Sequence, residues 1–408
     1  MTLRSWLAGA DDSAFSVHNL PYGIFTTADR PGERRIGVAI GDHVLDAGAA
    51  ARAVGVSCAV LEAPTLGPLM AAGRPTWRSV RHALTSWLTQ SGYAKAVAAR
   101  LVPRSEATLH MPFDVADYVD FYASEHHATN LGRLFRPGQE PLTPNWKHLP
   151  IGYHGRAGTI VVSGTPIVRP AGQRRPTDAA EPVFGASHRL DIEAEVGFVV
   201  GTPSALGTPV GLKGFTEHVF GVCLVNDWSA RDLQAWEYVP LGPFLGKSFA
   251  TSVSPWIVPL EALEYARTAP PPRDVEPLPY LDDRGEEPWG LDITLEIRLN
   301  GQPVSMPPFA AMYWTAAQQL AHLTANGASL RTGDFFASGT VSGPGPGSRG
   351  SLIELTWNGQ HPVKMADGSE RTFLQDGDEV LITATAPGPC GSRIGLGEVI
   401  GRISPAQD

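Results

Sequence analysis

Glycine and proline interrupt this sequence so often that a bundle of long helices is disfavoured. The chain has 44 glycines and 36 prolines among 408 residues. Glycine adopts backbone conformations that turns require, and proline removes a backbone donor and ends helices. Glycine also gathers at residues 152–158, 242–246 and 343–350, which are candidate site loops. The sequence therefore predicts many short strands joined by turns.

Hydrophobic periodicity places the regular elements. Residues 35–40 and 44–46 are predicted to form a hairpin that turns at Gly41-Asp42. Further strands are expected where apolar residues run together or alternate with polar ones, and helices where they recur every three or four positions. The expected strands are residues 191–196, 219–225, 291–299, 335–338, 352–357 and 379–385; the expected helices are residues 76–88, 228–238 and 308–325.

The chain divides into two predicted domains. Its length favours one small and one large domain over a single core. Residues 1–115 contain no cluster of catalytic residue types, and we expect them to serve packing or assembly. Residues 116–408 carry the chemistry-bearing side chains.

An all-acid strand is the first candidate site. Alternation along residues 191–196 places Asp191, Glu193 and Glu195 on one face, about 6.5–7 Å from one neighbour to the next. Such a face belongs either to a solvated edge strand or to a site for a hard cation. The strand predicted at residues 291–299 mixes acidic and basic residues on its polar face, as a solvated strand should. This contrast favours the cation.

A polar stripe follows the apolar run at residues 219–225. Asp227, Arg231, Gln234 and Tyr238 fall at i, i+4, i+7 and i+11, on one face if the segment is helical. The stripe either lines a cleft or faces water. Lys247 stands alone among glycines and apolar residues, and a buried lysine requires a partner.

If residues 117–130 form a helix, Asp120 and His127 share a face. Surface or satisfied core residues often show this pattern, so both interpretations stay open. Zinc is discarded, because Glu125-His126-His127 lacks the i, i+4 histidine spacing of zinc-protease helices. Glu193, Glu195, Asp227 and Asp120 would form an all-carboxylate set suited to Mg²⁺ or Ca²⁺.

Composition excludes several partners. The formal net charge is −9 with no basic run, so no nucleic acid is expected. No apolar run has membrane-spanning length, so no membrane partner is expected either. The three cysteines, at 58, 223 and 390, lack metal-type spacing and indicate a cytoplasmic protein.

The chain resembles the fumarylacetoacetase family along essentially its whole length. Characteristic segments include Asn19-Leu20-Pro21-Tyr22-Gly23 and Ala337-Ser338-Gly339-Thr340. The others are residues 120–122, 127–130, 145–146, 148–156, 161–166, 226–232, 236–248 and 312–314. The resemblance implies hydrolysis of 4-fumarylacetoacetate to fumarate and acetoacetate, the last step of tyrosine and phenylalanine breakdown.

The resemblance also implies roles for individual residues. His127 corresponds to the general base, oriented by Glu354. The implied metal ligands are Asp120, Glu193, Glu195 and Asp227, with a further cation contact around Lys247 and Thr251; the implied substrate contacts are Tyr122, Arg136, Tyr153, Gln234, Tyr238 and Thr340; and the groups that steady negative charge are Arg231, Gln234 and Lys247. Asp191 matches no ligand and is expected to tune or cap its strand.

The implied mechanism is attack by His-activated water, with acetoacetate leaving as an enolate held by Ca²⁺ and/or Mg²⁺. The implied fold is β-rich mixed α+β, with a small SH3-like N-terminal barrel and a larger C-terminal mixed β-roll. A homodimer is also implied.

Two alternatives remain at this point. A related acylpyruvate hydrolase, 2-keto acid decarboxylase or hydratase would share the acidic set, but the full-length first domain and the His127 segment argue against it. A non-catalytic metal-dependent binding protein would tolerate loss of His127 and Glu354 but not of the carboxylates.

Overall fold

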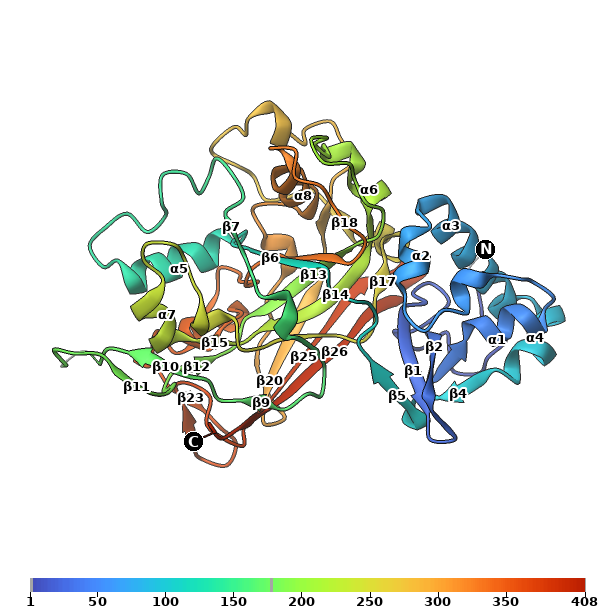
Figure 1. The fold of residues 1–408 in the computed structure, drawn as a ribbon, viewed down its shortest axis with the longest axis horizontal. Coiled ribbons are helices and arrows are strands. Elements are labelled where there is room, and N and C mark those ends of the chain that lie inside the picture. Colours follow the sequence, from blue (N-terminus) through green and yellow to red (C-terminus); the bar gives the residue numbers. More distant parts are fainter. Residues whose placement is uncertain (1–2, 177–178, 408) are drawn as a thin grey trace.

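The chain forms a β-rich mixed α/β structure with an N-terminal domain and a larger, curled C-terminal sheet (Figure 1). The computed structural model describes residues 3–176 and 179–407. Within these two ranges, no helix is both long and apolar enough to cross a membrane.

The N-terminal part is a five-stranded antiparallel sheet with helices packed against it. Its order is β4-β3-β2-β1-β5. The strands are β1 Tyr22–Thr27, β2 Arg30–Ile40, β3 His43–Asp46, β4 Leu101–Pro103 and β5 Ala107–His110; the helices are α1 Ala47–Ala53, α2 Gly67–Ala71, α3 Arg74–Thr89 and α4 Ser91–Ala98. The hairpin predicted at Gly41-Asp42 is confirmed as β2–β3.

Helix α3 confirms the helix expected at residues 76–88. It buries Trp77, Val80, Leu84, Trp87 and Leu88, the positions that the helical spacing selects. These five apolar side chains lie on one face of the helix, and that face packs into the N-terminal core. The opposite face is left to the solvent.

The larger part is built on an eight-stranded mixed sheet. Seven strands follow the order β7-β6-β22-β13-β14-β16-β8, and β17 pairs with β14 off that path. They are β6 Asp117–Phe121, β7 Gly152–His154, β8 Ile160–Val162, β13 Ala194–Val200, β14 Val219–Asp227, β16 Thr251–Val253, β17 Val258–Pro259 and β22 Asp334–Ala337. The pairs β22–β6 and β16–β8 are parallel. Strand β14 is buried throughout, as its apolar sequence predicts.

A second sheet, of order β21-β20-β25-β26-β9, packs against the first through a shared apolar core. Its strands are β9 Ile167–Val168, β20 Thr294–Leu299, β21 Gln302–Ser305, β25 Glu379–Pro387 and β26 Arg393–Ser404. Strand β20 alternates between buried and half-buried residues, and Asn300-Gly301 turns it into β21 at positive φ. This part of the sequence prediction is confirmed.

The two parts share apolar packing. The backbones of Tyr22 and Ile257 exchange two hydrogen bonds, of 2.9 and 2.7 Å. The ring of Trp77 meets that of Phe220 edge-on, with centroids 5.3 Å apart. One apolar cluster therefore runs from the N-terminal helices to one face of β14.

The helix considered for residues 117–130 is wrong. Residues 117–121 form strand β6, and helix α5 spans Glu125–Phe135. Ser124 begins the helix, since its hydroxyl accepts the His127 N–H at 3.2 Å. Asp120 and His127 thus come from a strand and a helix rather than from one helical face.

Other expected elements are shorter or different. The strand predicted at residues 191–196 is interrupted at Ile192 and Glu193, between β12 Leu190–Asp191 and β13. Helix α7 begins only at Arg231 because Ser229–Ala230, strand β15, pairs with β12. The helix predicted at residues 308–325 is confined to α8 Ala316–Thr324, capped by Thr315 and Gln318, after a 3₁₀ turn.

The strand predicted at residues 352–357 is wrong, because Leu352–Leu355 form the short helix α9. The remaining elements are α6 Phe215–His218, β10 Ala171–Arg174, β11 Val183–Ala186, β18 Arg267–Thr268, β19 Gly290–Leu291, β23 Val363–Lys364 and β24 Glu370–Arg371.

Candidate active site

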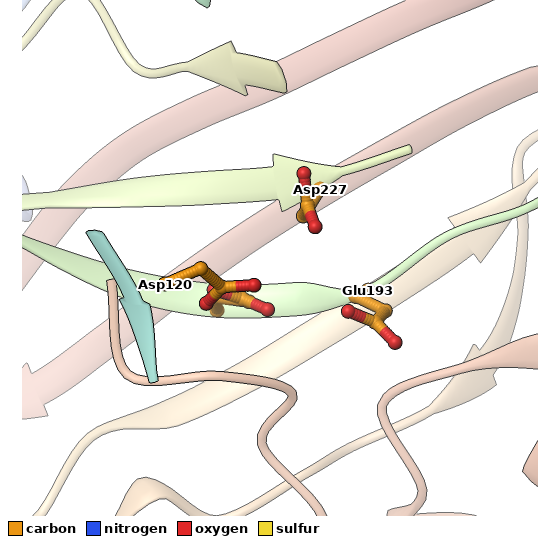
Figure 2. A group of neighbouring side chains, drawn as sticks. Asp120, Glu193 and Asp227 are labelled. Atoms are coloured by element: carbon orange, nitrogen blue, oxygen red, sulfur yellow. The ribbon is translucent and has the colours of Figure 1, made fainter. Parts of the chain in front are cut away.

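Four carboxylates meet at the ends of neighbouring strands of the large sheet. Asp120 comes from β6, Glu195 from β13 and Asp227 from the end of β14, while Glu193 lies at the break before β13. Each offers an oxygen within 4.8 Å of the others. Figure 2 shows Asp120, Glu193 and Asp227 converging from three separate segments. The sheet order thus brings together residues that are far apart in the sequence.

The acidic face is buried, which rules out the solvated edge strand. Glu195 and Asp227 are 0% exposed, and Asp120 and Glu193 are almost as buried. Burial and the neighbouring Asp227 raise the pKa of Asp120 well above its ordinary value. Burial and Asp120 do the same to the pKa of Glu195. Ionised carboxylates this close repel one another in a low dielectric unless positive charge lies between them.

The donor set fits a hard cation. Among the residues that the structure describes, neither oxygen of Glu195 has a hydrogen-bond partner, and Asp120 Oδ1 has none either. Buried carboxylate oxygens are ordinarily satisfied. Orphaned oxygens on adjoining strands are the arrangement that Mg²⁺ or Ca²⁺ would complete. The buried cluster could therefore hold a metal.

Lys247 supplies part of the positive charge. Its ammonium donates to Glu193 Oε2 and to Asp227 Oδ2, the latter at 2.6 Å. Burial alone would raise the pKa of Glu193, but Lys247 and Arg231 lower it below its ordinary value. Thr251 donates to Asp227 Oδ1 at 2.8 Å and Tyr153 to Asp227 Oδ2 at 3.2 Å. The partner that the sequence required for Lys247 is therefore a pair of carboxylates.

His127 and Glu354 form a buried pair. His127 Nδ1 lies 2.7 Å from Glu354 Oε2, and His127 Nε2 lies 3.7 Å from Glu193 Oε1. Burial alone would raise the pKa of Glu354, but His127 lowers it. An ionised Glu354 accepts a hydrogen bond from His127 Nδ1–H. The neutral ring then carries its free lone pair on Nε2. In that tautomer Nε2 is able to accept a proton.

Arg231 is held from three sides. Its Nε donates to Asp191 at 2.8 Å, Nη2 to Glu193 at 2.7 Å and Nη1 to Gln234 Oε1 at 3.1 Å. Because the Gln234 carbonyl oxygen accepts from Arg231, its amide N–H₂ is left to donate elsewhere.

A cavity of about 350 Å³ opens beside these groups. Arg231, Gln234 and Tyr238 line it, so the polar stripe faces a cleft rather than water. Eight other predicted site residues also line it: Asp120, Tyr122, His127, Arg136, Tyr153, Glu193, Lys247 and Thr340. Glu195, Asp227, Thr251 and Glu354 lie behind this wall.

Sequence reasoning missed the groups that hold Glu354. Asn130 donates to Oε1 at 2.9 Å, and Ser342 and Ser351 donate to Oε2 at 2.9 and 2.7 Å. Asn130 lies three residues after His127, a same-face spacing that could have indicated it. The serines lie in glycine-rich loops and gave no such signal. Apolar lining residues such as Phe135, Ile151 and Leu241 were also missed.

Comparison with known proteins identifies the family of this chain. The family model described as "Fumarylacetoacetate (FAA) hydrolase C-terminal" matches residues 117–403, and that described as "Fumarylacetoacetase N-terminal" matches residues 18–112. The chain belongs to the fumarylacetoacetase family.

Family members from distant eukaryotes match along their whole length. Human fumarylacetoacetase is 46% identical, with 98% of this chain and 99% of that protein covered. Fumarylacetoacetase of Oryza sativa subsp. japonica is 44% identical, with 99% and 98% covered. The match therefore includes the N-terminal domain as well as the carboxylate cluster.

Solved structures share the fold at lower identity. The fumarylacetoacetate hydrolase of Exiguobacterium antarcticum superposes with a TM-score of 0.54 at 18% identity, covering 95% of this chain and all of that one. A putative HpcE protein from Mycobacterium smegmatis gives 0.54 at 20% identity, covering 94% and 99%. These likenesses concern the fold alone.

Proposed function

We propose that this chain is a hydrolase that cleaves the carbon–carbon bond of 4-fumarylacetoacetate, releasing fumarate and acetoacetate. The observation that carries the proposal is the buried His127–Glu354 pair beside the carboxylate cluster, within a chain that matches fumarylacetoacetases from end to end. The full-length N-terminal match weighs against other reactions of the superfamily.

In this proposal His127 Nε2 takes a proton from water, and the resulting hydroxide attacks the ketone carbonyl of the fumaryl group. That carbon becomes the new carboxylate of fumarate when its bond to the acetoacetate carbon breaks. Glu354 keeps the proton on Nδ1 and favours the imidazolium that forms. His127 then returns the proton to the departing acetoacetate carbon, so that the water is divided between the two products.

Negative charge develops on oxygen during both steps. Arg231, the Gln234 amide and Lys247 line the cavity and can donate to it. Asp120, Glu193, Glu195 and Asp227 would hold Mg²⁺ or Ca²⁺, with Lys247 and Thr251 next to it. When bound, such a cation would supply positive charge for the substrate's dicarbonyl oxygens.

The remaining cavity residues would bind the substrate. Arg136 is a charged partner for a carboxylate, and Tyr122, Tyr153 and Tyr238 offer aromatic surface with polar tips. The Thr340 hydroxyl is buried and, within the described residues, has no hydrogen-bond partner, so it can serve the substrate.

The decisive experiment follows the loss of substrate absorbance with divalent cation and with chelator. Wild-type enzyme should consume fumarylacetoacetate with cation present. His127→Ala should lower kcat at least about 100-fold while its thermal unfolding stays cooperative, because general-base catalysis commonly supplies that factor. No substrate loss by wild-type enzyme with cation would refute the function; near-normal turnover by the variant would refute the base.

Finer features belong to the same proposal. The N-terminal sheet, with β4 and β5 joined by the 3₁₀ turn Arg104–Glu106, is compatible with a small SH3-like barrel over residues 1–115. The C-terminal β-roll from residue 116 and a cytoplasmic location are proposed with it.

We also propose a homodimer. Apolar side chains lie exposed on β11 and on the loop after α7, with Phe184 77% and Leu241 96% exposed. Val239 and Phe244 extend this group, and Figure 1 shows β10 and β11 projecting beyond the molecule's body near α7. Exposed apolar groups of this kind commonly mark contact surfaces.

A further inference from the structure

Asp191 is a buried carboxylate outside the set of metal ligands, yet all of its hydrogen-bonding capacity is used. It is 0% exposed. Oδ1 accepts the N–H groups of Ile192 and Leu352, each at 2.7 Å. Oδ2 accepts Arg231 Nε at 2.8 Å and the Ile353 N–H at 3.1 Å. One side chain thus joins three segments of the chain.

The first of its contacts fixes Arg231. Guanidinium is planar, so a donor bond at Nε fixes the plane in which the two terminal nitrogens lie. With Nε bound to Asp191, Nη2 reaches Glu193 and Nη1 reaches Gln234. The orientation of two cavity-lining side chains therefore depends on Asp191.

The second group of contacts fixes Glu354. Leu352 and Ile353 are the first two residues of α9, and their N–H groups are orphans unless a group outside the helix accepts them. The hydroxyl of the preceding Ser351 donates to Glu354, so it is occupied. Asp191 caps α9 in its place and thereby sets the position of Glu354, one residue further along.

The two groups of Asp191 contacts, one through Arg231 and one through α9 and Glu354, meet again at Glu193. Its Oε1 receives Arg231 Nη2 at 2.7 Å and lies 3.7 Å from His127 Nε2. His127 is bound to Glu354, which closes a ring of contacts that returns to Asp191 through α9. A displacement at Asp191 would therefore reach the base and the charge-stabilising arginine together.

We propose that Asp191 is a positioning residue for the hydrolysis. It fixes Arg231 and helix α9, which carries Glu354, relative to each other, so that His127 faces the reacting carbon. It touches neither the substrate nor the reacting atoms. The inference rests on the proposed function and adds a residue outside the expected ligand and substrate sets.

The direct test is Asp191→Asn in the full-length, cation-loaded enzyme. An amide has one oxygen, so its N–H₂ must face either Arg231 Nε and Ile353 N–H or the N–H groups of Ile192 and Leu352. Whichever way the amide turns, its N–H₂ faces other donors, and the hydrogen bonds on that side of Asp191 are lost. We expect kcat to fall about 100-fold with KM little changed, because small misplacements of catalytic groups cost that much.

Asp378→Asn is the matched control. Asp378 is also buried, at 3% exposure, and accepts from Arg371 and from the Gln375 N–H, but it lies outside the cavity wall. We expect it to lower the unfolding temperature about as much as Asp191→Asn while retaining wild-type kcat. Equal losses of kcat in both variants would overturn the inference.

Two further measurements keep the test decisive. If Asp191→Asn does not fold, Asp191→Ser provides a second variant: its hydroxyl stands where the carboxyl carbon lies, short of Arg231 and of α9, and kcat should again fall. In a Glu354→Gln background Asp191→Asn should cost much less than in wild type, since coupled groups are non-additive. Full kcat in a folded variant, or fully multiplicative losses, would overturn the inference. Inactive wild-type enzyme would instead overturn the proposed function.

Discussion

Glu195 occupies the least compensated position among the four carboxylates. Within the described residues neither of its oxygens has a hydrogen-bond partner, whereas Glu193 and Asp227 both receive Lys247. Its pKa in the folded protein is raised by burial and by Asp120. A carboxyl whose pKa is higher folded than unfolded destabilises the fold as pH rises above its unfolded value. At neutral pH the metal-free protein therefore carries this penalty.

We expect Glu195→Gln to stabilise the metal-free protein and to abolish its response to cation. In wild type, Mg²⁺ or Ca²⁺ at about one hundred times its dissociation constant should add roughly 2.7 kcal/mol to the free energy of unfolding. Thermal unfolding with and without cation measures both effects. Glu296→Gln, on the half-buried face of β20, is the control and should keep the wild-type response. A cation shift preserved in Glu195→Gln would exclude Glu195 as a ligand.

At the scale of elements, helix α5 depends on one glycine. A Cβ built on Gly132 would lie 1.9 Å from the Pro141 carbonyl oxygen. That oxygen also accepts Arg136 Nη2 at 2.7 Å, and Arg136 lines the cavity. The close approach of the loop to the helix therefore anchors a proposed substrate contact.

Gly132→Ala should push this loop away and release Arg136. We expect the free energy of unfolding to fall by about 1–3 kcal/mol, as for other overpacked sites, and KM for fumarylacetoacetate to rise more than kcat falls. Gly92→Ala, on α4 with nothing within 4 Å of the added carbon, should instead stabilise the protein by about 1 kcal/mol and leave kinetics unchanged. Unchanged KM in Gly132→Ala would contradict the role given to the loop.

Some helices and strands of this chain can be predicted from its sequence and others cannot. Elements governed by their own periodicity, such as α3, β14 and β20, are predicted correctly because each buries a face that its residues define. Helix α9 is not, since its apolar residues suit a strand equally well. Asp191, 161 residues earlier, accepts its first two N–H groups and so favours the helix. A contact over that separation leaves no local pattern.

The residues of the candidate site could be predicted in part. Residue types and motifs indicated the carboxylates, His127 and Lys247, and the structure brings them together at the cavity. Their spatial order is tertiary information: β22 lies between β6 and β13, and no spacing in the sequence expresses that. The partners of Glu354 in the 342–351 loops are tertiary in the same sense.

For the whole molecule, the exposed apolar group beside the cavity predicts association. Tyr238, Leu241 and Pro243 line the cavity, and Leu241 and Phe184 are among the most exposed apolar side chains. A second copy of this chain that covers Leu241 would therefore also cover part of the cavity wall.

Phe184→Glu should therefore convert a dimer into monomers, because a charge in a desolvated contact opposes association. Light scattering on the full-length chain at micromolar concentration measures the mass. Leu206→Glu is the control, since Leu206 is 83% exposed but lies in the loop after β13, and it should leave the dimer intact. Monomeric wild-type protein, or dissociation by both variants alike, would contradict the proposed dimer.

The place of β22 has a consequence for synthesis on the ribosome. Strands β6 and β7 join the large sheet only through β22 among the described strands, and β22 spans Asp334–Ala337. Asp120 thus reaches Glu195 and Asp227 only after residue 337 has emerged, although all four carboxylates have been translated more than a hundred residues earlier. A nascent chain shorter than this keeps Asp120 apart from the other three acids, because β13 and β14 pair directly but β6 does not reach them. The complete four-carboxylate site should therefore form only after most of the chain has been translated.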